Sequence, residues 1–388
     1  MSVDSDPFDD VLPTDPDATV VGRLFDPAVG PCVVTVRDRQ FVDLTALSPT
    51  MSALLDRDDL VDVVRTAPGG RRWPVAEVTR ASRDRNNTAP HLLAPIDLQV
   101  IKAAGVTFVR SLLERVIEER AKGDPTGAAA VRQQLVDTLG GALGDLVPGS
   151  TTAVKIKDML IAEGLWSPYL EVGIGPDPEI FTKAPVLSAV GYGAPVGVLE
   201  RSTWNNPEPE VVLVVNSSGV VVGATLGNDV NLRDFEGRGA LLLGTAKDNN
   251  ASCSIGPMIR ICESRFGLPS IIELEVEMRI VGADGFVLSE TSNMREMNRS
   301  PSQLVDHVYG RHHAYPDGFV LFTGTMFAPT RDRQEAGQGF THADGDVVTI
   351  ANSSLGRLVN IVTTAEDAPR WQWGIGRLMG NLAARGVL

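Results

Sequence analysis

Length, composition and charge already limit what this protein can be. At roughly 150 residues per domain, a chain of 388 residues has room for more than one domain and a sizeable core. Its 35 basic side chains against 49 acidic ones give a net charge of −14, which argues against nucleic acid or an anionic membrane as a partner, since phosphates need a basic surface. With three cysteines, no long apolar run and no signal-peptide pattern at its start, the sequence predicts a globular cytoplasmic protein.

Composition divides the chain into three parts. Residues 1–18 form an acidic leader with six aspartates and no Lys or Arg, a composition typical of disorder. Residues 19–93 mix β-rich and helical patterns, and we expect a small N-terminal α+β domain there. The polar stretch at residues 80–90 predicts a linker, so the main domain is expected at residues 94–388.

The predicted elements follow in chain order. Residues 31–47 predict two short strands around a charged turn, and Ser48 with Pro49 predicts the N-cap and first position of a helix. The main domain then contains a helical insert at residues 110–165. Its first helix, predicted at residues 108–122, has apolar side chains on one face and charges on the other.

Beyond about residue 170 the sequence consists of short β-rich segments separated by glycine. These predicted strands are residues 211–215, 219–226, 271–280, 318–325, 346–351 and 356–362. No glycine-rich phosphate loop and no nucleophile elbow accompanies them, so dinucleotide, nucleotide and serine-hydrolase functions lack their fingerprints. Strands that follow helices in this way predict an α+β fold.

Three carboxylates converge in the predicted hairpin at residues 204–236. Glu208 and Glu210 are two residues apart in a strand, so their side chains share one face. The expected register places Glu208 opposite Gly227, with Asp229 as the diagonal neighbour on the same face. Three like charges repel one another unless a cation lies among them, and oxygen-only donors suit Mg²⁺ or Mn²⁺. The alternative interpretation is an ordinary solvated strand face.

Five separated motifs make the chain resemble the fumarylacetoacetate hydrolase superfamily. The first is the Glu-x-Glu pair at residues 208–210 together with residues 227–234, and the others are residues 180–183, 247–257, 316–325 and 344–346. The resemblance spans residues 95–388, and the whole chain is most similar to the bacterial 2-keto-3-deoxy-pentonate dehydratases. It implies a mixed β-sandwich roll, and, for such proteins, a homodimer or homotetramer.

The resemblance also implies a ligand set and a substrate class. One divalent ion would lie on Glu208, Glu210 and Asp229, and the substrates of the superfamily carry a 2-oxo acid that chelates it. Lys247 and Arg233 occupy positions where the family places substrate contacts. A metal beside Lys247 should lower the pKa of its ammonium and make it a plausible proton carrier. Lys247 could instead be an ordinary surface lysine, and Arg233 could simply pair with Asp234 or Glu236.

Three further residues are candidates for binding a substrate. Thr325 also aligns with a contact position of the family, and Asn293 offers hydrogen bonds to hydroxyl groups. Arg110 would help to make the site locally positive, which an anionic sugar acid requires in a chain with a net charge of −14.

One departure from the family separates lyase from hydrolase chemistry. Hydrolytic members carry Gly-x-Asn-Tyr-x-x-His-x-x-Glu, whose His and Glu activate water. Residues 105–114 align with this segment, but Ser111 replaces the histidine while Glu114 is kept. We therefore expect poor hydrolysis, with Glu114, Lys247 and Ser111 forming the catalytic group of a dehydratase. Alternatively, Glu114 only pairs with Arg110 one turn earlier in the helix.

The leading hypothesis is a Mg²⁺- or Mn²⁺-dependent carbon–oxygen lyase that removes water from a 2-keto-3-deoxy sugar acid. A pentonate, which would give 2-oxoglutarate semialdehyde in oxidative pentose catabolism, is the first choice. A C–C hydrolase of acylpyruvate-like 2,4-dioxo acids is the first alternative. A non-catalytic, metal-stabilised binding protein is the second.

Overall fold

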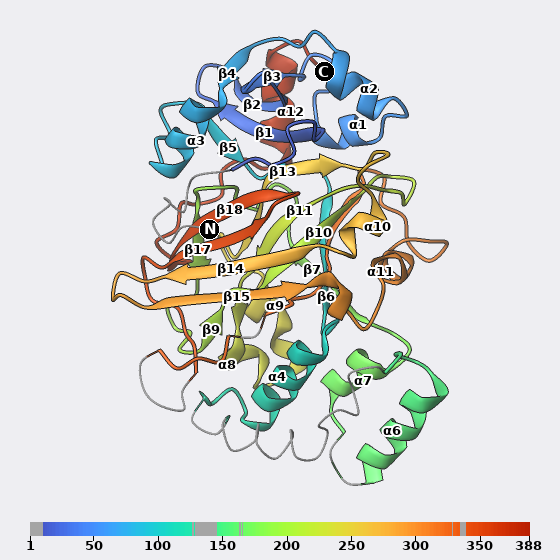
Figure 1. The fold of residues 1–388 in the computed structure, drawn as a ribbon. Helices are drawn as coiled ribbons and strands as arrows, with labels where there is room; N and C mark the ends of the chain where they lie inside the picture. Colours follow the sequence, from blue (N-terminus) through green and yellow to red (C-terminus); the bar gives the residue numbers. More distant parts are fainter. Residues whose placement is uncertain are drawn as a thin grey trace.

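The structure of the protein, a computed structural model, describes residues 11–125, 128, 146–162, 164, 166–327, 329–333 and 339–388, without the side chains of residues 109 and 110. Figure 1 shows three levels: an N-terminal unit at the top, two β-sheets in the middle, and the helices of the insert below. In the described part of the chain no helix is both long and apolar enough to cross a membrane.

The described helices are mostly short. They are α1 (Met51–Leu55), α2 (Leu60–Thr66), α3 (Val75–Arg83), α4 (Val109–Arg120), α6 (Thr151–Ala162), α7 (Pro168–Ile174), α8 (Arg233–Glu236), α9 (Leu243–Lys247), α10 (Leu268–Ile271), α11 (Pro301–Val308) and α12 (Ile375–Ala384), with 3₁₀ turns η1 (Ala240–Leu242) and η2 (Met294–Glu296). Of the segment predicted as a helical insert, α4 and α6 are confirmed, whereas residues 129–145 lie outside the described residues.

The strands form one large sheet, a smaller one and a two-stranded pair. They are β1 (Val20–Asp26), β2 (Gly30–Arg37), β3 (Gln40–Asp43), β4 (Arg72–Pro74), β5 (His91–Leu93), β6 (Val100–Gly105), β7 (Glu179–Ala184), β8 (Pro195–Val198), β9 (Asn205–Asn206), β10 (Pro209–Val215), β11 (Val221–Asp229), β12 (Asn231–Leu232), β13 (Cys253–Ile261), β14 (Glu275–Val281), β15 (Val287–Asn293), β16 (Phe319–Phe322), β17 (Val347–Asn352) and β18 (Gly356–Thr364).

The large sheet runs in the order β4-β3-β2-β1-β13-β11-β10-β16-β6-β7, with β5 paired to β1. The smaller sheet, β15-β14-β17-β18-β8, packs on the central strands of the large sheet. Alternate residues of β10 explain this packing: Val211 and Leu213 face the core between the sheets, while Val212 and Val214 face a second core that includes residues of α1. The predicted α+β sandwich is thus confirmed.

The N-terminal unit contacts the rest of the protein at strand β13 and at helix α12. Strand β1 pairs with β13, so the strands of residues 19–93 extend the large sheet. Helix α12 packs on the same unit through hydrogen bonds from Asn381 to the Val29 carbonyl and from Arg385 to the Pro31 carbonyl, at 2.9 and 2.6 Å. The second half of the predicted leader is also ordered: Asp15 pairs with Arg260 at 2.7 Å. Residues 1–10 lie outside the described part.

Two predicted boundaries are wrong for local reasons. The N-cap of α1 is Thr50 instead of Ser48, because the Asp97 carboxylate binds the backbone N–H groups of Met51 and Ser52 and fixes the helix start there. The expected linker at residues 80–90 begins inside α3 and continues as hydrogen-bonded turns.

The strand predicted at residues 271–280 also starts later than expected. A proline in the first turn opens helix α10, and this helix takes the beginning of the predicted segment, so β14 starts at Glu275.

Asp346, just before β17, binds His342 and Arg333 and should control the stability of the fold in acid. Burial alone would raise the pKa of its carboxyl, but hydrogen bonds from His342 and Arg333 lower it to about 2. Since this is below the value of about 3.9 in an unfolded chain, the ionised group stabilises the fold above about pH 4, and that contribution is lost as the pH falls towards 2. We expect Asp346→Asn to lower the free energy of unfolding by about 2 kcal/mol at pH 7.

Urea unfolding at several pH values checks this expectation. The difference between the wild type and Asp346→Asn should shrink between about pH 4 and pH 2. The exposed Asp344 supplies a matched control, whose Asn variant should unfold like the wild type. A difference that stays constant down to pH 2 would contradict the assigned role.

Candidate metal centre

The hairpin of β10 and β11 brings together the three predicted carboxylates. Glu210 lies opposite Gly227, and the backbone N–H of Asp229 donates to the Glu208 carbonyl at 3.0 Å. Asp229 is therefore the direct partner of Glu208, and the predicted pairing of Glu208 with Gly227 is wrong. A tighter turn and a β-bulge shift the register by two residues in all, which leaves the same side chains on the same face.

The geometry fits a metal centre. One carboxylate oxygen from each of Glu208, Glu210 and Asp229 lies within 4.8 Å of the others, and among the described residues these three form the group that could hold a metal ion. Each is at most 3% exposed. The predicted alternative of a solvated strand face is thus wrong.

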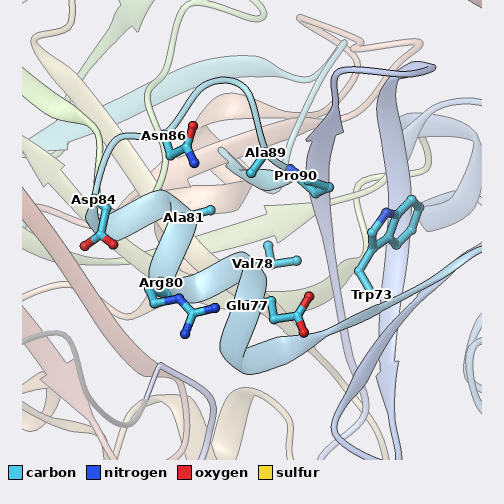
Figure 2. A pocket seen from close by; sticks show the side chains of 9 residues that line it. All are labelled: Trp73, Glu77, Val78, Arg80, Ala81, Asp84, Asn86, Ala89 and Pro90. Atoms are coloured by element: carbon cyan, nitrogen blue, oxygen red, sulfur yellow. The ribbon is translucent and has the colours of Figure 1, made fainter.

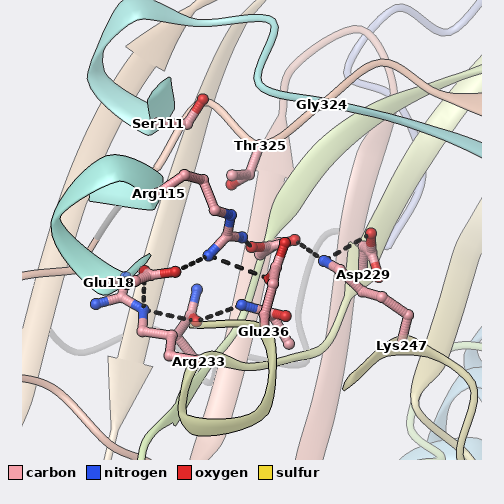
Figure 3. A network of polar contacts seen from close by, with 12 residues as sticks. Ser111, Arg115, Glu118, Asp229, Arg233, Glu236, Lys247, Gly324 and Thr325 are labelled. Atoms are coloured by element: carbon pink, nitrogen blue, oxygen red, sulfur yellow. Dashed lines mark hydrogen bonds and ion pairs between the residues drawn. The ribbon is translucent and has the colours of Figure 1, made fainter. Parts of the chain in front are cut away.

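Buried cations contact these carboxylates (Figure 3). Lys183 on β7 pairs with Asp229 at 2.7 Å and also donates to backbone carbonyls. Lys247, at the end of α9, contacts both Glu208 and, at 3.2 Å, Asp229. Arg115 on α4 contacts the other oxygen of Glu208. All three cations belong to elements far apart in the sequence, so only the fold brings them together.

The ion pairs continue away from the hairpin. Arg115 also pairs with Glu118 at 2.5 Å and with Glu236 at 3.4 Å. Arg233 on α8 lies 3.2 Å from Glu118 and donates to the Asn206 amide oxygen at 2.9 Å. Charges therefore alternate in a continuous buried series that runs from α8 through α4 to strands β10 and β11. Its members in order are Arg233, Glu118, Arg115, Glu208, Lys247, Asp229 and Lys183.

The balance of charge favours a divalent cation. Six carboxylates (Glu118, Glu179, Glu208, Glu210, Asp229 and Glu236) surround four cations (Arg115, Lys183, Arg233 and Lys247), an excess of two negative charges if all are ionised. Burial raises the pKa of Glu210 well above its ordinary value, and the charges of Asp229 and Glu208 add to this effect. Buried charge of one sign is costly unless it is compensated. A hard divalent ion matches both the oxygen donors and the excess.

The pKa of Lys247 does not fall in these surroundings. Burial lowers it, but the charges of Asp229, Glu208 and Glu236 outweigh burial and raise it. The lowered pKa predicted from the sequence for Lys247 assumes that a metal cation is bound beside it, and it stays a prediction. For Asp229, burial raises the pKa, while Lys183 and Lys247 lower it more strongly.

A narrow cavity adjoins the carboxylates and encloses only about 10 Å³ of free space. It is lined by Ala104, Gly105, Val106, Ser111, Arg115, Glu179, Phe181, Glu208, Glu210, Asp229, Glu236, Lys247 and Thr325. Burial raises the pKa of Glu179 to about 7, with the charge of Glu236 as the next cause. A group that titrates near neutrality suits proton transfer.

Besides the three carboxylates, three of the predicted catalytic and substrate-binding residues line this cavity: Ser111, Lys247 and Thr325. The hydroxyl of Ser111 donates to the Phe108 carbonyl of its own helix at 2.8 Å, and that of Thr325 donates to the Phe327 carbonyl at 2.9 Å. Both hydroxyl groups are thus engaged with the backbone.

The other predicted residues lie outside the lining. Glu114 is buried on α4 but does not border the cavity. Asn293 ends β15, where its side chain caps η2 by accepting from the Arg295 N–H at 2.9 Å. Arg233 is 2% exposed and binds protein groups on all sides, including the Pro329 carbonyl at 3.1 Å. The side chain of Arg110 is outside the described part.

Sequence reasoning missed several members of the site. For Arg115 and Glu118 a signal existed, because Ser111, Arg115 and Glu118 recur at helical spacing on one face of α4. The sequence-based prediction instead pairs Ser111 with Glu114, which lies on a neighbouring face of the helix. Lys183 and Glu179 fall within or beside a segment matched by resemblance, but nothing local marks either as part of a site.

A second, larger cavity lies on the N-terminal unit, between α3 and Trp73 (Figure 2). It measures about 200 Å³, and its charged side chains are Glu77, Arg80 and Asp84. The described residues there do not include a metal-binding group. The chemistry therefore points to the smaller cavity beside the hairpin.

These observations define an α+β sandwich protein with three converging buried carboxylates that could hold a divalent metal. A family model described as "Fumarylacetoacetate (FAA) hydrolase C-terminal" matches residues 175–363. The "Probable 2-keto-3-deoxyxylonate dehydratase" of Haloferax volcanii is 30% identical over 332 residues, which cover 84% of this chain and 94% of that protein. The chain belongs to the fumarylacetoacetate hydrolase family.

Further similarity falls on the same group of proteins. The "2-dehydro-3-deoxy-D-arabinonate dehydratase" of Saccharolobus solfataricus is 34% identical over 186 residues, 48% of this chain and 58% of that one. A solved "2-keto-3-deoxy-D-arabinonate dehydratase complexed with magnesium and 2,5-dioxopentanoate" shares the fold, with a TM-score of 0.61, 21% identity and coverage of 89% of this chain and 99% of that one. The predicted family is confirmed, and the relatives' names agree with the predicted carbon–oxygen lyase class.

Proposed function

We propose that the protein is a divalent-metal-dependent dehydratase of a 2-keto-3-deoxy sugar acid, with a pentonate as substrate and 2,5-dioxopentanoate (2-oxoglutarate semialdehyde) as product. Three converging buried carboxylates beside a cavity lined by Glu179, whose pKa is about 7, carry the proposal. The names of the two curated relatives and the magnesium complex of the structural neighbour support it. The reaction belongs to sugar acid catabolism.

Glu208, Glu210 and Asp229 would hold the ion, Mg²⁺ or Mn²⁺. When bound, such an ion supplies Lewis-acid stabilisation of the negative charge that develops on the 2-oxo acid as its C3 proton leaves. The chain's own groups must then accept the C3 proton and release the C4 hydroxyl as water. Tautomerisation of the unsaturated product then gives the dioxo acid in two hydrogen shifts. One hydrogen moves from C5 to C3 and leaves an enol at C4–C5, and the hydroxyl hydrogen of this enol moves to C4 to give the C5 aldehyde.

Glu179 is the best placed group for the C3 proton. It lines the cavity, and its pKa of about 7 lets it accept and return a proton near neutrality. The sequence suggested Glu114 for this role, but Glu114 does not border the cavity. Lys247 remains a partner for the oxygen atoms of the substrate.

The two alternatives have less support. Hydrolysis of a C–C bond needs a base for water, and Ser111, which replaces the histidine of hydrolytic members, donates its hydroxyl to the backbone. A purely structural metal site would not need Glu179 beside the ligands. The cytoplasmic location and the homodimeric or homotetrameric state stay predictions.

A panel of substrates tests the proposal. Purified protein with Mg²⁺ is incubated with 2-keto-3-deoxy pentonates and hexonates of both C4 configurations, and aldehyde formation is measured. We expect turnover of a five-carbon acid with a kcat of the usual order of about 10 s⁻¹. Turnover of acylpyruvates alone would establish the hydrolase instead, and turnover of nothing, with Mg²⁺ bound, would favour a binding protein.

A further inference from the structure

Both carboxylate oxygens of Glu208 are occupied by protein cations. One oxygen accepts from Arg115 and the other from Lys247. Each of these cations is at least 90% buried. Because Glu208 is one of the three metal-binding carboxylates, a divalent ion has to share or replace one of these ion pairs.

The remaining partners decide which cation can give way. Within the described residues, Lys247 forms ion pairs with Glu208 and Asp229, so both its partners are metal-binding groups. Arg115 pairs in addition with Glu118 and Glu236, which are not. Removing the partner of a buried charge is strongly destabilising, but Arg115 keeps two carboxylates after losing Glu208. Arg115 is therefore the cation that can leave Glu208 at the smaller cost.

We propose that Arg115 is an exchangeable counter-ion: it neutralises Glu208 before a metal binds, and afterwards its released N–H group binds the carboxylate of the 2-oxo acid. This inference rests on the proposed function and adds a binding order. Arg115 borders the same cavity as the carboxylates, so the released donor stays beside the bound ion. Its guanidinium has five N–H donors in a planar fork, which suits a carboxylate and lets it retain Glu118 and Glu236.

The charge balance sets the order. With all groups ionised, the cluster carries an excess of two negative charges, so an anionic substrate that arrives first would increase a buried excess. A divalent cation that arrives first cancels it and frees the donor for the anion. Ion and anion should then each strengthen the binding of the other by the same factor.

Calorimetric titration of the full-length protein tests the inference without turnover. Mn²⁺ is the ion and pyruvate the simple 2-oxo acid, each titrated alone and in the presence of the other. For the wild type we expect pyruvate to bind only to the Mn²⁺-loaded protein. For Arg115→Gln we expect Mn²⁺ to bind about 10-fold more tightly, because a competing positive charge is gone, and pyruvate to bind the loaded protein at least about 10-fold more weakly. Arg120→Gln, on the same helix but outside the cavity lining, is the matched control and should behave like the wild type.

The outcomes separate this inference from the function it rests on. A wild type that binds no Mn²⁺ would refute the metal-dependent function itself. A wild type that binds both, beside an Arg115→Gln variant with unchanged pyruvate affinity or weaker Mn²⁺ binding, would overturn only the role of Arg115, as would pyruvate binding without Mn²⁺. If Arg115→Gln does not fold, Arg115→Lys decides, since it keeps the charge but loses the fork: Mn²⁺ affinity should stay within about 3-fold and pyruvate affinity fall about 10-fold.

Discussion

Replacement of Glu210 by Gln should abolish dehydration while the protein stays folded. Gln keeps the shape of Glu210 and an oxygen that can accept from the Gly324 N–H, which Glu210 binds at 2.6 Å. It removes one of three buried anionic donors, so we expect Mn²⁺ affinity to fall more than about 10²-fold and turnover to become undetectable. The variant should unfold at a temperature no lower than that of the wild type, because the two neighbouring carboxylates no longer repel a third negative charge.

Ion titration and an activity assay measure this effect, and thermal unfolding checks the fold. Glu275→Gln, at an exposed strand position of β14, is the matched control and should retain full activity. Treatment of the wild type with EDTA should stop turnover, and added Mg²⁺ or Mn²⁺ should restore it. Full activity in metal-free buffer would exclude the proposed mechanism.

The second large effect is expected at Glu179. Glu179→Gln removes the proton acceptor and should lower kcat about 10²-fold or more, with little change in Mn²⁺ affinity. A base with a pKa of about 7 is ionised above that pH, so the wild-type rate should rise with pH at or below about pH 7, since a bound cation can only lower this value. In the variant this limb of the profile should disappear.

Glu114→Gln distinguishes this assignment from the one suggested by the sequence. If Glu179 takes the proton, Glu114→Gln keeps its kcat within a few-fold of the wild type and keeps the same pH profile. If kcat instead falls about 10²-fold in Glu114→Gln and not in Glu179→Gln, the sequence-based assignment is correct, and Glu179 is not the base although it lines the cavity.

Local patterns in the sequence predicted the three carboxylates, because a strand repeats every two residues and a short hairpin brings its own partners together. The exact register could not be predicted, since a bulge leaves no mark in a run of valines. Lys247 was found only through resemblance to a family.

The cations and acids around the metal ligands lie beyond local patterns. Arg115 is 93 positions from Glu208 along the chain, and Lys183 pairs with Asp229, and Glu236 with Arg115, from other elements. Their roles follow from the packing of α4, α8 and β7 around the hairpin, which spacing alone does not reveal. The buried Arg233 shows the converse: resemblance suggested a substrate contact, whereas its partners are protein groups.

The docking of α12 on the N-terminal unit has a consequence for synthesis of the chain. Asn381 and Arg385, which bind the strands around Val29 and Pro31, are made about 350 residues later than those strands. At roughly 5–20 residues per second, the interval is about 20–70 s. For most of that time β1 also lacks β13, which pairs with it at Val20 and Val21, although β2 and β5 can already pair with the strand. The nascent chain therefore leaves one edge at the start of β1 unpaired for tens of seconds, and we expect the yield of folded protein to depend on chaperones that cover such strand ends.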